Sequence, residues 1–146
     1  MDHRTYLKID LNKLEHNYNS VRNKLPSGVK LLGVIKANAY GNGGVEIGKF
    51  LDDKCDFFGV ACIEEAIELK QAGIKTPILI LGRVFPFDVE KAVKYDIRIP
   101  IFSYDDAVIL SNEAVKQNKN MPYHFCIDTG MSRIGFQINE ESADIC

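Results

Sequence analysis

The chain has 146 residues, of which 46% are hydrophobic and 26% charged, and its 18 basic and 20 acidic side chains leave a net charge of −2. This composition is typical of a soluble globular domain with a buried core, and it offers no basic surface for a nucleic-acid backbone. No apolar run approaches the roughly 18 residues of a membrane-spanning helix, and the opening residues 1–5 are polar, so we expect a cytoplasmic protein.

The cysteines and histidines do not form a metal-binding pattern. The four cysteines lie far apart without a CxxC pair, and only three histidines accompany them. We therefore expect no metal site, and we expect the thiols to remain reduced as small apolar side chains.

Short apolar runs alternate with amphipathic stretches along the whole chain. Asp10 is expected to cap a first helix that ends before Pro26. The predicted strands are 30–35, 57–61, 78–81, 97–102 and 123–127, and the later predicted helices are 45–51, 64–72, 89–95, one capped by Ser103 and one capped by Asn139. The unbroken apolar run 78–81 suits a strand buried on both faces of a parallel sheet.

This alternation predicts an α/β fold of about five βα units around a parallel sheet. Periodicity alone leaves two architectures open, an open doubly wound sheet and a (β/α) TIM barrel. A complete eight-stranded barrel needs about 250 residues. If the fold is a barrel, residues 1–146 are therefore an incomplete, partial barrel.

The first segment with chemical character is Val34–Gly43, which reads VIKANAYGNG. Lys36 follows the first strong strand, at the end where barrel enzymes place their sites. Its small and apolar neighbours disfavour the charged ammonium and would free the amine to react with a carbonyl. The alternative is a surface lysine whose stem packs on the turn.

The glycines after Lys36 are not a dinucleotide-binding fingerprint. A G-x-G-x-x-G pattern from Gly41 requires glycine at position 46, where the chain has Glu46. The cluster either lets the backbone approach a ligand or simply forms a tight turn.

The second such segment is His124–Phe136, which reads HFCIDTGMSRIGF and again follows a predicted strand. The planar fork of Arg133 suits a carboxylate or a phenolate, and the flanking glycines would let a ligand approach. The alternative is a structural arginine paired with Asp128 or Glu140.

Together, VIKANAYGNG and IDTGMSRIGF resemble the amino-terminal barrel of the alanine racemases, which are fold-type III pyridoxal-phosphate enzymes. KANAYG alone is also similar to related decarboxylases, whereas the second segment points to the racemase branch. The resemblance covers essentially the whole chain. It implies that residues 1–146 are the amino-terminal part of a pyridoxal-phosphate-binding barrel, without the remaining strands and the carboxy-terminal β-domain.

The resemblance also assigns roles to matching positions. Lys36 matches the lysine that holds pyridoxal 5'-phosphate covalently and exchanges a proton with the substrate α-carbon. Tyr40 matches the tyrosine that contacts the cofactor phosphate, and Arg133 the arginine that faces the cofactor phenolic oxygen and the substrate carboxylate. The implied reaction is two-base racemisation of L- and D-alanine in a homodimer, with a tyrosine of a second subunit as the other base.

Two residues depart from the family pattern in addition to the length. Asn42 stands where members usually have histidine, and asparagine also tolerates turn conformations. Cys126 stands where many members have a lysine, often carbamylated, that orients the arginine. The chain by itself is therefore expected to be weakly active or inactive. The alternatives are a serine or broad-specificity amino-acid racemase and a non-catalytic partial barrel that binds pyridoxal phosphate.

Overall fold

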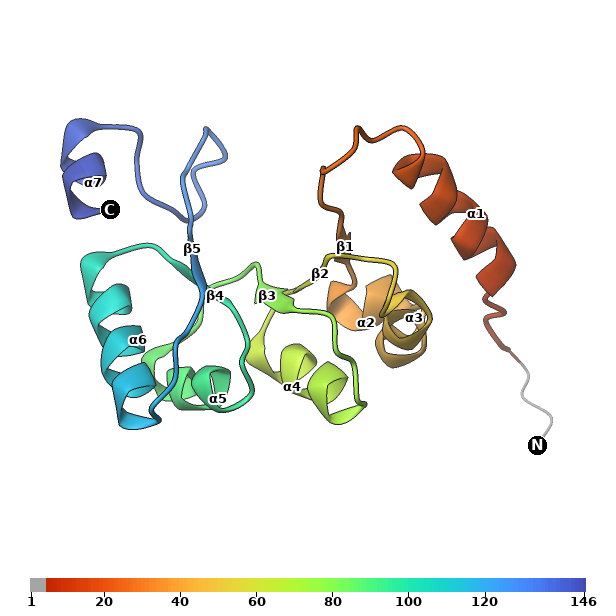
Figure 1. The fold of residues 1–146 in the computed structure, drawn as a ribbon, viewed down its shortest axis with the longest axis horizontal. Helices are drawn as coiled ribbons and strands as arrows, with labels where there is room; N and C mark the ends of the chain where they lie inside the picture. Colours follow the sequence, from red (N-terminus) through yellow and green to blue (C-terminus); the bar gives the residue numbers. More distant parts are fainter. Residues whose placement is uncertain (1–4) are drawn as a thin grey trace.

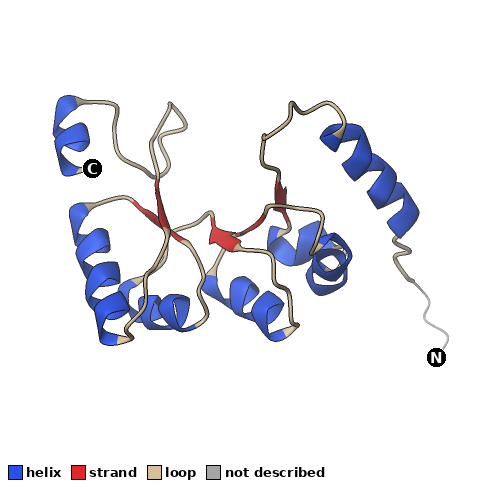
Figure 2. Cartoon of the chain, viewed as in Figure 1, coloured by secondary structure: helices blue, strands red, loops and turns tan. Residues whose placement is uncertain are grey.

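The computed structural model describes residues 5–146, and the polar opening segment of residues 1–4 lies outside the described residues. Five short strands alternate with helices (Figures 1 and 2). The strands are β1 (Leu32–Val34), β2 (Phe57–Val60), β3 (Ile78–Ile80), β4 (Ile99–Ile101) and β5 (Tyr123–Phe125). The helices are α1 (Leu11–Arg22), α2 (Lys36–Gly41), α3 (Gly44–Leu51), α4 (Ile63–Gln71), α5 (Val89–Lys94), α6 (Tyr104–Lys116) and α7 (Glu140–Ile145), with a short 3-10 turn η1 (Pro86–Asp88) before α5.

Every strand pairing is parallel and joins strands that follow one another in the chain. β1 pairs with β2, β2 with β3, and β4 with β5. Arg98, just before β4, connects the two groups because its N–H donates to Ile78 O over 2.9 Å and its carbonyl accepts from Ile80 N–H over 3.0 Å. An unbroken order from β1 to β5 is the barrel arrangement, whereas a doubly wound sheet reverses direction at a switch point. Within residues 5–146 the sheet does not close, so the fold is a partial barrel.

Helices α1, α6 and α7 begin where a local side chain caps them, as the sequence predicted. Asp10 Oδ1 accepts from the N–H groups of Asn12 and Lys13 at the start of α1, over 3.0 and 3.3 Å. Ser103 Oγ accepts from Asp106 N–H over 3.2 Å in α6, and Asn139 Oδ1 accepts from Ser142 N–H over 2.8 Å in α7. Each such cap stabilises a helix by about 1 kcal/mol.

The core lies between the strands and the helices that pack on one side of them (Figure 1). Phe58 and Val60 of β2 and Ile78 and Ile80 of β3 have no exposed surface, and burying each side chain contributes about 1.5–3 kcal/mol. The predicted strand at 78–81 forms over Ile78–Ile80, but only the face of Ile78 and Ile80 is fully buried, because Leu79 and Leu81 on the opposite face are half-buried. The strands are shorter than predicted, although flanking residues such as Ile35 and Leu81 still donate backbone hydrogen bonds to the neighbouring strand.

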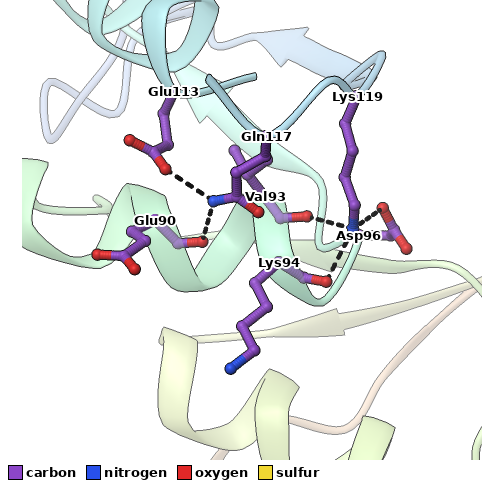
Figure 3. Close-up of polar contacts among 7 residues, drawn as sticks. All are labelled: Glu90, Val93, Lys94, Asp96, Glu113, Gln117 and Lys119. Atoms are coloured by element: carbon purple, nitrogen blue, oxygen red, sulfur yellow. Dashed lines mark hydrogen bonds and ion pairs between the residues drawn. The ribbon is translucent and has the colours of Figure 1, made fainter. Parts of the chain in front are cut away.

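Lys119, in the loop after α6, fastens the carboxyl end of α5 (Figure 3). Its Nζ donates to the carbonyls of Val93 and Lys94, each over 2.8 Å, and to Asp96 Oδ1 over 2.9 Å. Carbonyls in the last turn of a helix have no partner within the helix, and a cation there satisfies them. Gln117 Nε2 donates to the backbone carbonyl of Glu90 over 3.0 Å and adds a second link between α5 and α6.

One side of β5 and the segment after it remains uncovered. Tyr123, Phe125 and Ile127 are 49%, 41% and 47% exposed, whereas His124 and Cys126 between them are half-buried. The burial therefore alternates with the two-residue period of a strand. Among residues 5–146, no helix is both long and apolar enough to cross a membrane.

Candidate functional site

Lys36 lies at the carboxyl end of β1, where the chain turns in the opposite hand to an ordinary helix. The four residues 37–40 that follow it all have left-handed backbone angles, with φ between 51° and 55° and ψ between 38° and 50°. For residues with a side chain this conformation costs roughly 1–2 kcal/mol each, and it is normally visited by single residues. A run of four marks stored backbone strain, and such strain collects at functional sites.

Hydrogen bonds hold the left-handed turn in place. Ala39 N–H donates to Ile35 O over 2.9 Å, and Gly44 N–H donates to Asn38 Oδ1 over 2.6 Å. Gly43 N–H donates to Asn38 O over 3.0 Å, at a φ of 94° that glycine adopts readily. The glycine cluster therefore closes the turn and starts α3.

The turn has a buried side and an exposed side. Ala39 is 5% exposed and belongs to the core, whereas Tyr40 is 63% exposed. Lys36 is half-buried. The structure thus brings Lys36 and Tyr40 together on one turn, with a tyrosine ring that a bound molecule can reach.

Glu65, on the first turn of α4, contacts this turn from the neighbouring βα unit. Its Oε1 accepts from Ala37 N–H over 2.7 Å, and its Oε2 accepts from Ala61 N–H over 2.8 Å. The sequence by itself does not point to Glu65. A glutamate at the third position of a helix is an ordinary capping residue, and nothing in the sequence signals a contact 28 residues away.

Asp128 organises the loop that follows β5. Its Oδ1 accepts from Gly130 N–H and Ser132 N–H, each over 2.9 Å, and its Oδ2 accepts from Gln137 Nε2 over 3.2 Å. These donors, with Ser132 and Gly130 first, hold the pKa of Asp128 below its ordinary value. The carboxylate therefore acts inside the loop as an anchor for the backbone.

Backbone bonds close the same loop at its base. Asp128 N–H donates to Phe136 O over 2.8 Å, and Phe136 N–H donates to Cys126 O over 2.7 Å. Gly135 has a φ of 120°, and a Cβ there would lie 2.8 Å from the Asp128 nitrogen. Glycine at this position is required both by the backbone angle and by the space.

Arg133 lies exposed on this closed loop. The four ion pairs found among residues 5–146 include neither Arg133 nor Lys36. The ion pair of Arg133 with Asp128 or Glu140, which is the alternative for this arginine, is therefore not among them. Arg133 and Cys126 line one hollow of about 230 Å³, and the Cys126 thiol is 3.9 Å from Ile134 O.

The two loops share one edge of the sheet through its topology, since β1 and β5 belong to one row of parallel strands. Carboxyl ends of parallel strands meet at a common edge. A cavity of about 690 Å³ between α6 and β5 is lined by other residues, among them Leu110, Met121 and Tyr123.

Outside these loops, the ionisable side chain of His124 lies in β5. His124 Nε2 is buried without a hydrogen-bond partner among residues 5–146, and burial, followed by the charge of Arg98, lowers the pKa of His124. No group of three or more histidine, cysteine, aspartate or glutamate side chains able to hold a metal ion is found in the described part of the chain.

The side chains at the two loops match the chemistry of a phosphorylated aldehyde. Lys36 offers an amine for the carbonyl carbon, Tyr40 a hydroxyl donor for a phosphate oxygen, and Arg133 a planar cation for a phenolate or carboxylate. By donor type, therefore, Lys36, Tyr40 and Arg133 fit pyridoxal 5'-phosphate.

Comparison with known proteins gives a consistent result. Residues 9–146 match the family described as "Alanine racemase, N-terminal domain". The chain is 41% identical over 133 residues to alanine racemase 1 of Caldanaerobacter subterraneus subsp. tengcongensis, which covers 90% of this chain and 34% of that protein. It is 43% identical over 143 residues to the alanine racemase of Staphylococcus carnosus, covering 94% of this chain and 36% of that one.

Solved structures show the same likeness in three dimensions. The alanine racemase of Clostridium difficile 630 in complex with cycloserine superposes with a TM-score of 0.90 at 41% identity, covering 92% of this chain and 37% of that chain. The present chain thus spans little more than a third of the length of the relatives it matches.

Proposed function

The chain belongs to the alanine racemase family, and from this premise we propose that it is the amino-terminal, cofactor-holding part of a pyridoxal-phosphate-dependent isomerase that interconverts L- and D-alanine. The observation that carries the proposal is the left-handed turn that presents Lys36 and Tyr40 at the carboxyl end of β1. The names of the relatives favour alanine over serine or a broad range of amino acids.

Within this proposal each side chain has a defined task. Lys36 Nζ would hold the cofactor covalently and would serve as the base on one face of the substrate α-carbon. The Tyr40 hydroxyl donates to the phosphate, and the Arg133 fork binds the phenolic oxygen and the substrate carboxylate. Pyridoxal phosphate, when bound, supplies the electron-withdrawing ring that makes the α-hydrogen acidic.

The remaining parts of the site lie outside residues 1–146 in this proposal. The other face of the α-carbon needs a second base, which the family resemblance assigns to a tyrosine of a second subunit. We therefore propose that the whole protein is a cytoplasmic homodimer. Residues 1–146 alone would be weakly active or inactive.

A labelling experiment tests the assignment of Lys36 in this chain. The protein is incubated with a limiting amount of pyridoxal phosphate, reduced with borohydride, digested and mapped by mass spectrometry. We expect the label mainly on Lys36, and we expect Lys36→Ala to lose it. Lys49→Ala is the matched control, because Lys49 is an exposed lysine on the neighbouring helix α3, and it should leave the labelling of Lys36 unchanged.

Activity tests the same assignment in the whole protein. We expect Lys36→Ala to abolish racemisation, because the attachment of the cofactor and one proton transfer disappear together. We expect Arg133→Lys to lower kcat/KM, because an ammonium cannot make the two-pronged contact of a guanidinium. Turnover of Lys36→Ala within tenfold of the parent protein would show that another residue carries the chemistry.

A further inference from the structure

Glu65 uses its two carboxylate oxygens for two different βα units. Oε2 accepts from Ala61 N–H, just after β2 and just before its own helix α4, which is the usual back-contact of a glutamate in the first turn. Oε1 accepts from Ala37 N–H, the residue next to Lys36. Helix capping explains the first contact but not the second.

The second contact acts on strained backbone. Ala37 is the first of the four left-handed residues, with φ 51° and ψ 50°. The bonds from Ala39 to Ile35 and from Gly44 to Asn38 stay within one stretch of the chain and fix the shape of the turn. The bond from Ala37 to Glu65 reaches another helix, so it fixes where the turn lies relative to β2.

The Ala37 N–H belongs to the peptide plane that joins Lys36 to Ala37, so its direction is set by rotation about the Cα–C bond of Lys36. Rotation about that bond would turn the N–H away from Glu65 Oε1 and would reorient Lys36 relative to the turn. A hydrogen bond to a charged acceptor is stronger than one between neutral groups, so the carboxylate opposes that rotation.

We propose that Glu65 is a positioning residue for Lys36, an inference that rests on the proposed function. The carboxylate holds Ala37 N–H, locks the start of the left-handed turn against α4, and thereby sets the orientation of the Lys36 amine for covalent attachment of pyridoxal phosphate. Glu65 itself does not touch the cofactor.

The decisive variant is Glu65→Gln, which keeps one acceptor oxygen and the helix-capping ability of the side chain but replaces the other oxygen with an NH2 donor, so Ala37 N–H and Ala61 N–H no longer each have an acceptor oxygen. The matched control is Glu64→Gln, an exposed residue of the same helical turn that undergoes the same change of charge. Urea unfolding of both variants checks that the fold remains intact.

Two measurements on the 146-residue chain decide the proposal. In Glu65→Gln we expect about tenfold weaker labelling of Lys36 by limiting pyridoxal phosphate, the effect of losing one hydrogen bond to a charged group. We also expect the amide proton resonance of Ala37 to move and hydrogen exchange of residues 37–40 to accelerate. Glu64→Gln should match the wild type in both measurements within twofold.

Labelling of Lys36 within twofold of the wild type in Glu65→Gln would overturn the positioning role, whatever happens to the exchange. If wild-type Lys36 takes up no pyridoxal phosphate, the proposed function fails by itself. In that case the amide measurements alone test whether Glu65 holds the Ala37 N–H. Unchanged hydrogen exchange of residues 37–40 in Glu65→Gln would overturn this contact as a constraint on the turn.

Discussion

Replacing Ala37 by glycine should stabilise the protein, although the same replacement in an ordinary helix destabilises it. Ala37 is exposed, so glycine removes little packing, and its φ of 51° lies in the region that glycine enters without steric cost. Relief of the left-handed conformation should contribute about 1–2 kcal/mol to the free energy of unfolding. The greater conformational freedom of glycine in the unfolded chain offsets about 0.4–1 kcal/mol of this gain in stability.

The net expectation is a gain of about 0.5–1 kcal/mol, since backbone strain outweighs unfolded-state entropy at this position. With a urea slope of about 1–3 kcal/mol per molar, the unfolding midpoint should rise by roughly 0.2–1 M. Equilibrium unfolding in urea, followed by far-ultraviolet circular dichroism, measures this shift.

Ala107→Gly is the matched control, because Ala107 lies within the right-handed helix α6. It should lower the stability by about 1 kcal/mol, the helix propensity difference between alanine and glycine. A midpoint for Ala37→Gly that falls as the midpoint for Ala107→Gly does would refute the left-handed turn and the strain derived from it.

Further consequences concern the loop after β5 and the end of α5. Gly135→Ala should lower the free energy of unfolding by about 1–3 kcal/mol and accelerate hydrogen exchange in the loop, because φ of Gly135 is 120° and the new Cβ would lie 2.8 Å from a backbone atom. Exchange rates equal to those of the wild type would contradict this packing. The pKa of Asp128 is lowered in the folded state, so the stabilisation by this carboxylate is present above the ordinary value of 3.8 and is lost as the pH falls through the folded pKa. As the pH falls, the melting temperature of Asp128→Asn should therefore decrease less steeply than that of the wild type. Parallel curves of melting temperature against pH would contradict this stabilisation. Lys119→Met removes three hydrogen bonds at the end of α5, among them those to Val93 and Asp96. It should lower the free energy of unfolding, measured in urea, by about 1–2 kcal/mol. An unchanged unfolding midpoint would mean that water replaces the lysine as hydrogen-bond donor.

Local patterns in the sequence determined much of the fold. Asp10, Ser103 and Asn139 cap helices because a short side-chain acceptor reaches N–H groups two or three residues away, and that contact depends only on neighbouring residues. Apolar runs likewise indicate strands, because the burial of a short segment depends mainly on the types of its own few residues. The alternation of the two predicted the βα units, but it left the choice between a barrel and an open sheet undecided.

Tertiary structure alone decided the order of the strands and the conformation of the candidate site. The pairing of β3 with the residue before β4 continues the strand order and so distinguishes the partial barrel from a doubly wound sheet. No local pattern in the sequence predicts this contact. The sequence pointed to Lys36, Tyr40 and Arg133 as candidates, and their roles stay predictions until the cofactor is tested. It indicated neither the left-handed turn at Ala37 nor the reach of Glu65, because strained backbone is stable only when distant groups hold it, and distance along the chain hides those groups from local patterns.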